Sequence, residues 1–333
     1  MPDNQTLPEI GTLERRLAAG QFAVTAEIVP PRVPALTAVT KKALALAPVA
    51  DAVNITDNAS ANVKMSSIAV SLYLAQMGIE PVFQVVCRDR NRLAMQADLL
   101  GVLAMGVQNI FAITGDHIIH GDHPQAKPVH DVDSVQLIQI FNRIRTEGLF
   151  ASGVEVRATP KFPIRTPHFF LGGAANPFGD PLPIHVLKMA KKKKAGADFI
   201  QTQCIFDMDR FREFMSVVRD NGLDEKLHIL AGVMPVKSNR ALEFMADSVP
   251  GMRIPPKSIT RLGGADDIEE EGIKMTVEII EELKEVPGVR GVHVMTVGWE
   301  AIIPELLSRT NLLPENRGDL PEIETADDEP AAA

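Results

Sequence analysis

Two carboxyl side chains occur where apolar, strand-like runs of this sequence end. Glu27 lies within the run 22–29, and Asp116 follows the run 109–114 and Gly115. Burial among apolar neighbours favours the protonated form of a carboxyl group, so Glu27 could donate a proton near neutral pH. A glycine before Asp116 allows a tight turn or the close approach of a ligand. Taken singly, Glu27 is equally compatible with an ion pair and Asp116 with a turn or helix cap.

A histidine-rich segment contains the second of these carboxylates. Residues 116–133 hold four of the eight histidines of the chain and four aspartates. Histidine and carboxylate side chains are ordinary metal ligands, but their spacing here matches no closed metal-binding motif. Long loops that follow strands are also commonly polar. We therefore expect no metal site.

Residues 191–194 are four consecutive lysines in an expected helix. Consecutive helical residues point in different directions, so one or two of these lysines could contact a phosphate group while the others face solvent. The sequence has neither a Gly-x-Gly-x-x-Gly pattern after its first expected strand nor a P-loop. A Gly-x-Ser-x-Gly nucleophile elbow is absent as well. We expect the two cysteines, Cys87 and Cys204, to pack as small side chains at strand ends.

Composition and charge narrow the class of protein further. The chain has 333 residues, a formal net charge of −9, and only 14 Phe, one Trp and one Tyr. Its core must be built mostly from aliphatic side chains, which favours helices packed on a sheet. Residues 315–333 hold seven acidic residues and one arginine, so this segment carries −6 and the rest of the chain −3. We expect 315–333 to be a disordered acidic tail, because few apolar side chains offset the entropy of ordering it.

Several classes of protein are excluded by the same counts. The sequence offers no evident basic face for nucleic acid, and no apolar run approaches the roughly 20 residues that span a membrane. The first residues lack the basic and apolar regions of a signal peptide. Two cysteines are too few for a disulfide scaffold or a four-cysteine metal site. These features predict a cytoplasmic protein.

Short strand-like runs alternate with longer helical runs along the whole chain. The expected strands are 22–29, 52–56, 81–87, 109–114, 169–175, 198–203, 228–233 and 291–297. The expected helices are 35–47, 64–77, 91–105, 134–146, 184–195, 207–221, 238–248 and 267–284. Eight such units predict one (β/α)₈ barrel over residues 1–314, with a doubly wound open sheet as the alternative. Chemistry in such a barrel occurs at the carboxyl ends of the strands, where Glu27 and Asp116 would meet.

Two segments interrupt this alternation. Residues 151–167 read as an extended excursion before the fifth strand. Residues 250–264, with paired prolines and paired glycines, read as a loop or a broken short helix.

Seven segments, in this order, resemble the methylenetetrahydrofolate reductase family. They are Thr-Ala-Glu-Ile-Val-Pro-Pro at 25–31, Asn-Ile-Thr at 54–56, Cys-Arg-Asp-Arg-Asn at 87–91, Thr-Gly-Asp at 114–116, Gly-Gly-Ala-Ala-Asn-Pro at 172–177, Ala-Gly-Ala-Asp-Phe-Ile-Gln-Thr-Gln at 195–203 and Ala-Gly-Val-Met-Pro-Val at 231–236. The resemblance covers about residues 15–312. It implies a (β/α)₈ barrel that holds FAD and reduces 5,10-methylenetetrahydrofolate to 5-methyltetrahydrofolate in one-carbon metabolism and methionine biosynthesis.

The resemblance also implies roles for single residues. Glu27 matches the acid that protonates a ring nitrogen of the folate, Asp116 the carboxylate that binds the pterin edge and tunes the flavin, and Gln203 a pterin contact. The flavin-binding positions that it implies are Thr56, Ala59, Gln84, Thr114, Gly115, Ala174, Asn176, Asp180, His185, Lys188, Lys191 and Lys192. Four positions depart from the commoner bacterial pattern: Gln84 replaces His, Thr114 replaces Arg, Asn176 replaces Tyr and Cys204 replaces Phe.

Further expectations concern partners and alternatives. The resemblance implies NADH, NADPH or a partner electron-transfer subunit as the source of electrons, and self-association of the chain. A pterin-binding barrel that passes a methyl group to a corrinoid would share the acidic site and need no flavin. A subunit that functions only inside a reductase complex is a further alternative.

Overall fold

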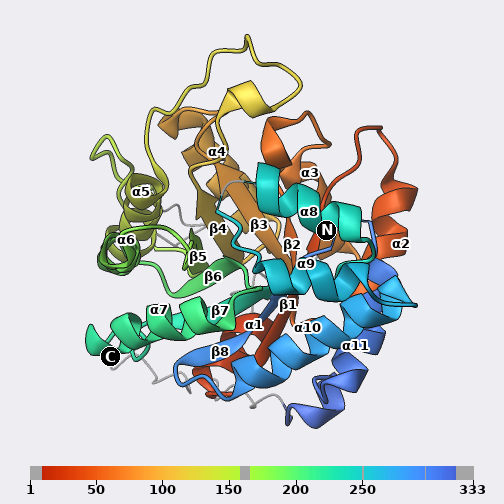
Figure 1. Ribbon diagram of the computed structural model, residues 1–333. Coiled ribbons are helices and arrows are strands. Elements are labelled where there is room, and N and C mark those ends of the chain that lie inside the picture. Colours follow the sequence, from red (N-terminus) through yellow and green to blue (C-terminus); the bar gives the residue numbers. More distant parts are fainter. Residues whose placement is uncertain (1–9, 158–165, 250, 297, 320–333) are drawn as a thin grey trace.

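The computed structural model describes residues 10–157, 166–249, 251–296 and 298–319. Within these residues, eight parallel strands form a closed barrel in sequence order, and β8 pairs with β1 (Figure 1). The strands are β1 Ala23–Ile28, β2 Ala52–Ile55, β3 Pro81–Val86, β4 Asn109–Ile113, β5 Phe170–Ala175, β6 Phe199–Cys204, β7 His228–Val233 and β8 Val289–Val294. The predicted (β/α)₈ barrel is confirmed, and the open sheet is wrong.

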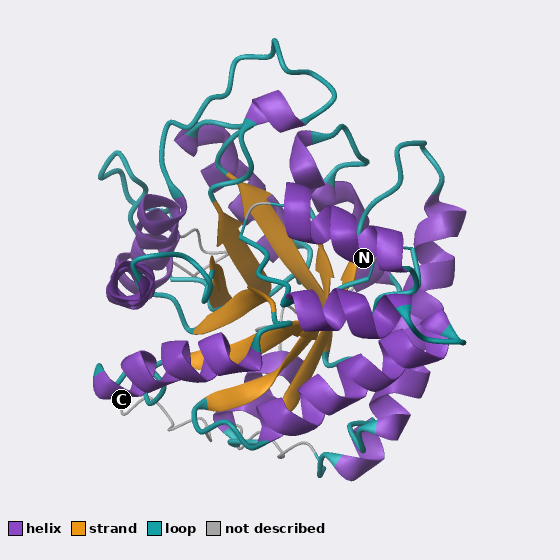
Figure 2. Ribbon diagram, in the orientation of Figure 1, coloured by secondary structure: helices purple, strands orange, loops and turns teal. Residues whose placement is uncertain are grey.

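A ring of helices surrounds the barrel (Figure 2). Eight of them lie close to their predicted ranges: α2 Leu36–Leu46, α3 Ser67–Gln76, α4 Arg92–Ala104, α5 Ser134–Glu147, α6 Leu182–Ala195, α7 Met208–Asp220, α8 Asn239–Ser248 and α10 Ile268–Lys284. The segment expected to be a loop or a broken helix contains α9 Pro256–Gly263. Sequence reasoning missed α1 Thr12–Ala18, α11 Ile303–Arg309 and the 3₁₀ turns η1 Ala59–Ala61, η2 Ile118–His120, η3 Glu300–Ile302 and η4 Pro314–Asn316.

Side-chain caps fix where several of these helices begin. Each cap accepts a hydrogen bond from the backbone N–H three residues later, which satisfies a donor that has no partner within the helix. These capping residues are Asn91, Asp133, Asp207, Ser238 and Asp267. A left-handed glycine ends α5 at Gly148 and α6 at Gly196. The caps explain why these helix boundaries could be predicted from local sequence.

The inside of the barrel changes from apolar to polar along the strands. Alternate strand residues point inward. Near the amino-terminal ends, these residues form a buried apolar cluster around Phe111, Phe170 and Phe199, and the cluster is covered by Leu13 and Leu17 of α1. Gly172 provides room for it, since a Cβ there would lie 2.3 Å from the Phe199 ring. The amino-terminal end of the barrel is therefore closed.

A buried ion triad joins the end of the described chain to this closed face. Arg16 Nε lies 2.7 Å from one Asp51 carboxylate oxygen, and Arg317 contacts the other. Arg16 also donates to the carbonyl oxygens of Arg317 and Gly318, at 3.2 Å each. The predicted disordered tail is thus wrong for residues 315–319, because Arg317 finds a buried carboxylate that no local pattern reveals. Residues 320–333 lie outside the described residues.

We expect Arg317→Ala to lower the free energy of unfolding by about 2–4 kcal/mol, because it leaves buried Asp51 with one of its two arginines. Urea unfolding measures the change. Asn316→Ala, at an exposed position of the same turn, is the control and should unfold like the parent. Equal stability of the two variants would mean that the triad does not stabilise the fold.

Candidate active site

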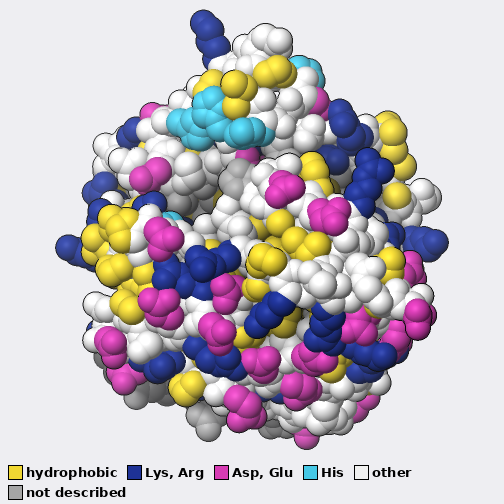
Figure 3. Space-filling model, viewed as in Figure 1, with side chains coloured by type: hydrophobic (Ala, Val, Ile, Leu, Met, Phe, Trp, Pro, Cys, Tyr) yellow, Lys and Arg dark blue, Asp and Glu magenta, His cyan; other side chains and the backbone are white. Residues whose placement is uncertain are grey.

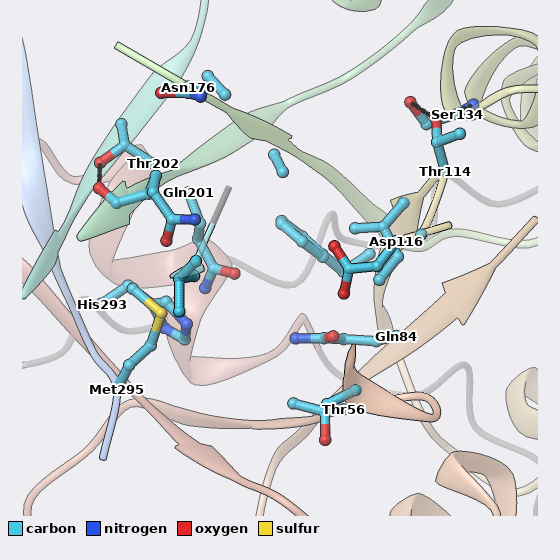
Figure 4. A pocket seen from close by; sticks show the side chains of 18 of the residues that line it. Thr56, Gln84, Thr114, Asp116, Ser134, Asn176, Gln201, Thr202, His293 and Met295 are labelled. Carbon is cyan, nitrogen blue, oxygen red and sulfur yellow. Dashed lines mark hydrogen bonds between the residues drawn. The ribbon is translucent and has the colours of Figure 1, made fainter. Parts of the chain in front are cut away.

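A cavity of about 870 Å³ opens at the carboxyl ends of the strands. Every strand contributes a lining residue near its end: Glu27, Thr56, Gln84, Asp116, Ala174, Gln203, Met234 and His293, from β1 to β8 in turn. Side chains from opposite sides of the barrel converge on this space (Figure 4). The barrel interior at the closed end holds the apolar cluster, so the inward polar side chains lie towards the end where a ligand could enter.

A continuous chain of buried hydrogen bonds forms the floor of the cavity. Asn54 and Gln201 exchange two hydrogen bonds, at 2.7 and 3.0 Å. Gln201 Nε2 also donates to Thr25 Oγ1 at 3.0 Å, and this hydroxyl lies 2.9 Å from His293 Nδ1. The chain fixes the imidazole so that its Nε2 lies 3.7 Å from Glu27 Oε2.

Glu27 lies next to His293, at the end of this hydrogen-bond network, and lines the cavity. Its side chain is 16% exposed, so the carboxyl group is sheltered yet accessible from the cavity. Gln84 Nε2 lies 3.5 Å from Glu27 Oε2, on the side away from β8. The carboxyl group is therefore bracketed by an imidazole and an amide, and no Lys or Arg ion pair to it occurs among the described residues.

The two cysteines are buried, as expected. Burial and the nearby Glu27 carboxyl raise the pKa of the Cys204 thiol, and its sulfur lies 3.7 Å from Met295 Sδ. Burial also raises the pKa of Cys87 to about 12. Both side chains therefore stay as thiols and pack, rather than acting as thiolate nucleophiles.

Asp116 lies in the loop after β4, and its side chain reaches the cavity (Figure 4). The residue before it, Gly115, has a φ of +91°, a conformation that side chains with a Cβ rarely adopt. The Asp116 carboxylate has no hydrogen-bond or ion-pair partner within the described part of the chain. It is therefore available to a ligand.

The wall formed by α6 is cationic. His185, Lys188 and Lys192 line the cavity from successive turns of the helix. Lys192 Nζ donates to the Ala174 carbonyl, and burial lowers the pKa of this ammonium group to about 8. Burial, with Lys188 nearby, also lowers the pKa of His185. This wall suits an anionic part of a ligand.

Two predicted positions do not reach the cavity. The side chain of Asp180 is 73% exposed and pairs with Arg210 at 2.5 Å. Lys191 is exposed on α6, rotated by about 100° from Lys192, whereas Lys188 and Lys192 are one turn apart on the same face. The other predicted flavin and folate positions all line it: Glu27, Thr56, Ala59, Gln84, Thr114, Gly115, Asp116, Ala174, Asn176, His185, Lys188, Lys192 and Gln203.

Two hydroxyl groups of the lining differ in their availability. Thr114 donates to Ser134 Oγ at 3.1 Å and accepts from the Ser134 backbone N–H at 3.2 Å, so it is already engaged. Thr56 Oγ1 is buried and has no hydrogen-bond partner among the described residues. A buried hydroxyl without a partner is costly, so a ligand atom beside Thr56 would be stabilised there.

Sequence reasoning missed Gln201, His293 and Met295 as lining residues. The spacing of these residues could have indicated them, because side chains two residues apart on a strand point to the same side of the sheet. Gln201 lies two residues before Gln203, and Met295 two residues after His293. The missing information was the partner of each side chain, which lies on a distant strand.

The histidine-rich segment forms no metal cluster. His120 lines the cavity, and exposed histidines of this segment lie at the top of the surface in Figure 3. Within the described ranges, no group of three or more His, Cys, Asp or Glu side chains is placed to hold a metal ion. No helix in those ranges is both long and apolar enough to cross a membrane.

The model of the family described as methylenetetrahydrofolate reductase matches residues 12–311. The chain belongs to the methylenetetrahydrofolate reductase family. It is 26% identical over 261 residues to methylenetetrahydrofolate reductase 2 of Schizosaccharomyces pombe, an alignment that covers 74% of this chain and 39% of the relative. It is 27% identical to methylenetetrahydrofolate reductase 2 of Saccharomyces cerevisiae, over 75% of this chain and 40% of that one. The chain thus spans about two-fifths of the length of these relatives.

A solved structure has the same fold. It is described as an uncharacterized protein from Clostridium thermocellum that binds two copies of 5-methyl-5,6,7,8-tetrahydrofolic acid. The TM-score is 0.62 at 15% identity, and the match covers 91% of this chain and 97% of that one. This methylenetetrahydrofolate reductase family member therefore shares its barrel fold with a solved structure.

We expect Lys192→Met to raise the free energy of unfolding by about 2 kcal/mol at pH 7. The pKa of Lys192 in the folded protein lies below that of a free lysine. At neutral pH, its charged ammonium group therefore destabilises the folded state of the parent. This destabilisation is lost as the pH rises from about 8 towards the pKa of lysine in the unfolded chain. The difference in unfolding free energy between Lys192→Met and the parent should therefore shrink over that range. Urea unfolding at pH 7 and 10 measures this difference, with exposed Lys191→Met as the control. An advantage independent of pH would contradict the assignment.

Proposed function

We propose that this protein is an oxidoreductase of one-carbon metabolism that uses FAD to reduce 5,10-methylenetetrahydrofolate to 5-methyltetrahydrofolate. One observation carries the proposal: in a chain of this family, the bracketed Glu27 and the unpaired carboxylate of Asp116 face the same cavity. A sheltered acid and a free carboxylate in one pocket can take separate duties in proton transfer and substrate binding.

The cavity residues fit a flavin dinucleotide. A volume of about 870 Å³ lies within the usual range for ligand cavities, roughly 300–1,000 Å³. Lys188 and Lys192 would hold the pyrophosphate by their charge, and His185 on the same wall could hydrogen-bond it. The unpartnered Thr56 hydroxyl and the Gln84 amide would hydrogen-bond the polar edge of the ring system. When bound and reduced, the flavin supplies the hydride.

Glu27 would act as the general acid. The methylene carbon of the substrate bridges N5 and N10, and the product keeps this carbon on N5. Glu27 therefore transfers its proton to N10. The carbon–nitrogen bond breaks, its electron pair stays on that nitrogen, and the methylene carbon becomes an iminium carbon that accepts a hydride. His293 and Gln84 lie on either side of the Glu27 carboxyl group, at 3.7 and 3.5 Å from its Oε2 atom, and would limit its movement.

Asp116 and Gln203 would bind the pterin. The Asp116 carboxylate can accept hydrogen bonds from the N–H groups along the pterin edge. Gln203 Oε1 accepts from the Cys204 backbone N–H at 3.0 Å, which orients its side-chain amide and leaves the NH₂ group as a donor. The two side chains come from the loop after β4 and from β6, and they would contact the substrate from separate directions.

We also infer the electron donor, the cellular location and the oligomeric state. NADH, NADPH or a partner electron-transfer subunit reduces the flavin, and the protein works as a cytoplasmic homo-oligomer. Flavin absorbance of the purified protein separates the electron donors: bleaching by NADH or NADPH supports a nicotinamide, and bleaching by dithionite alone supports a partner. Size-exclusion chromatography with light scattering measures the oligomer. A colourless protein that still binds folate would favour the methyl-transfer alternative and overturn the flavin assignment.

We expect Glu27→Gln to retain bound flavin and its reduction but to lower the rate of folate reduction by about 10²- to 10⁴-fold, because the amide cannot donate the required proton. Stopped-flow absorbance follows the two half-reactions separately. Glu14→Gln, whose carboxylate pairs with His168 in the loop before β5, is the matched control. Full folate turnover by Glu27→Gln would remove this residue from its role.

Asp116→Asn should raise the KM for methylenetetrahydrofolate about tenfold or more, since a charge-assisted hydrogen bond to the pterin is lost. Steady-state kinetics at several folate concentrations give KM and kcat. The control is Asp209→Asn, at a side chain that is 87% exposed on α7. Unchanged folate kinetics in Asp116→Asn would contradict the assignment.

A further inference from the structure

Arg88, just beyond β3, is almost completely buried but does not line the cavity. Its guanidinium group donates to both Asp89 carboxylate oxygens, at 2.7 and 2.9 Å. It also donates to the carbonyl oxygen of Asp116 at 3.2 Å and to that of Asn58 at 3.1 Å. One side chain therefore joins the loops that follow β2, β3 and β4.

The loop after β2 has an unfavourable backbone conformation. Asn58, Ser60 and Ala61 have φ values of +46°, +55° and +57°, which cost free energy for residues other than glycine. Ala59 and Ser60 in this loop line the cavity. Asp89 accepts a hydrogen bond from Asn58 Nδ2 at 3.0 Å, so the Arg88–Asp89 pair holds the loop at both its backbone and its side chain.

The loop after β4 packs directly on the same arginine. A Cβ at Gly115 would lie 2.3 Å from Val86 and 3.3 Å from the Arg88 Cβ. The Arg88 carbonyl accepts from the Val129 backbone N–H at 2.7 Å, which ties down the returning end of the histidine-rich segment. The hydrogen bond from Arg88 goes to the backbone carbonyl of Asp116, so Arg88 does not occupy the Asp116 carboxylate.

We propose that Arg88 is a positioning residue for folate binding: it sets the Asp116 carboxylate relative to the loop of residues 58–61 without touching the substrate. The planar guanidinium group supplies donors in fixed directions to three loops at once, which the single ammonium group of lysine cannot reproduce. A small displacement of a binding group can cost a large factor in rate or affinity. The inference rests on the proposed function, because it acts through Asp116.

The test is a double-mutant cycle of Arg88→Lys and Asp116→Asn in the full-length protein loaded with flavin. We expect Arg88→Lys alone to raise the KM for methylenetetrahydrofolate about tenfold, while kcat changes less than threefold. In the Asp116→Asn background, Arg88→Lys should raise KM little further, because both changes disturb the same contact. Arg92→Lys, an exposed arginine that holds the same segment through Asp131, is the control and should leave KM unchanged.

The outcomes separate the two proposals. If Arg88→Lys and Asp116→Asn raise KM by independent factors that multiply, Arg88 does not act through Asp116 and the inference is overturned. If Asp116→Asn itself leaves KM unchanged, the proposed role of Asp116 fails instead. Should Arg88→Lys fold poorly by circular dichroism, Asp89→Asn weakens the same cluster while keeping Arg88, and the same non-additivity with Asp116→Asn is expected. Multiplying factors in that cycle would likewise overturn the inference.

Discussion

The hydrogen bonds of Gln201 across the barrel interior are the interaction on which the site depends. Its amide joins Asn54 of β2 to Thr25 of β1, although Gln201 itself belongs to β6. Polar groups buried at such a depth require partners, so a single inward amide constrains strands on opposite sides of the barrel. The chain continues to His293 and ends beside Glu27. The Glu27 carboxyl group thus lies beside a polar layer that also separates the apolar closed end from the open cavity.

Charge is distributed around the cavity in a way that suits two ligands. The carboxyl groups of Glu27 and Asp116 come from β1 and the loop after β4, and the cations come from α6. The cationic side can take phosphate groups, and the acidic side can take the hydrogen-bond donors of a pterin. Lys192 shows that this distribution of charge lowers the stability of the fold, because burial lowers the pKa of its ammonium group to about 8. A buried charge that lowers the stability of the fold is the kind of group that functional sites retain.

Buried charged side chains hold connecting segments at both ends of the barrel. Arg88 joins three loops at the open end, and Arg16 and Arg317 bind Asp51 at the closed end. Both clusters connect segments that lie far apart in the chain. An arginine can do this because its guanidinium group offers several donors in one plane. The barrel provides the strand ends, and these clusters set how the connecting segments lie on them.

Local patterns were enough to predict the alternation of strands and helices, because hydrophobic periodicity, caps and glycines act within a few residues. The motifs at 25–31 and 114–116 also singled out Glu27 and Asp116, and both residues line the cavity. Which lysines of α6 face the cavity depended on the rotation of the packed helix, so Lys192 reaches it and Lys191 does not. The partners of Gln201, His293 and Arg317 depended on closure of the barrel, which brings residues hundreds of positions apart into contact. A sequence pattern states what each side chain can do, whereas only the folded chain sets what lies beside it.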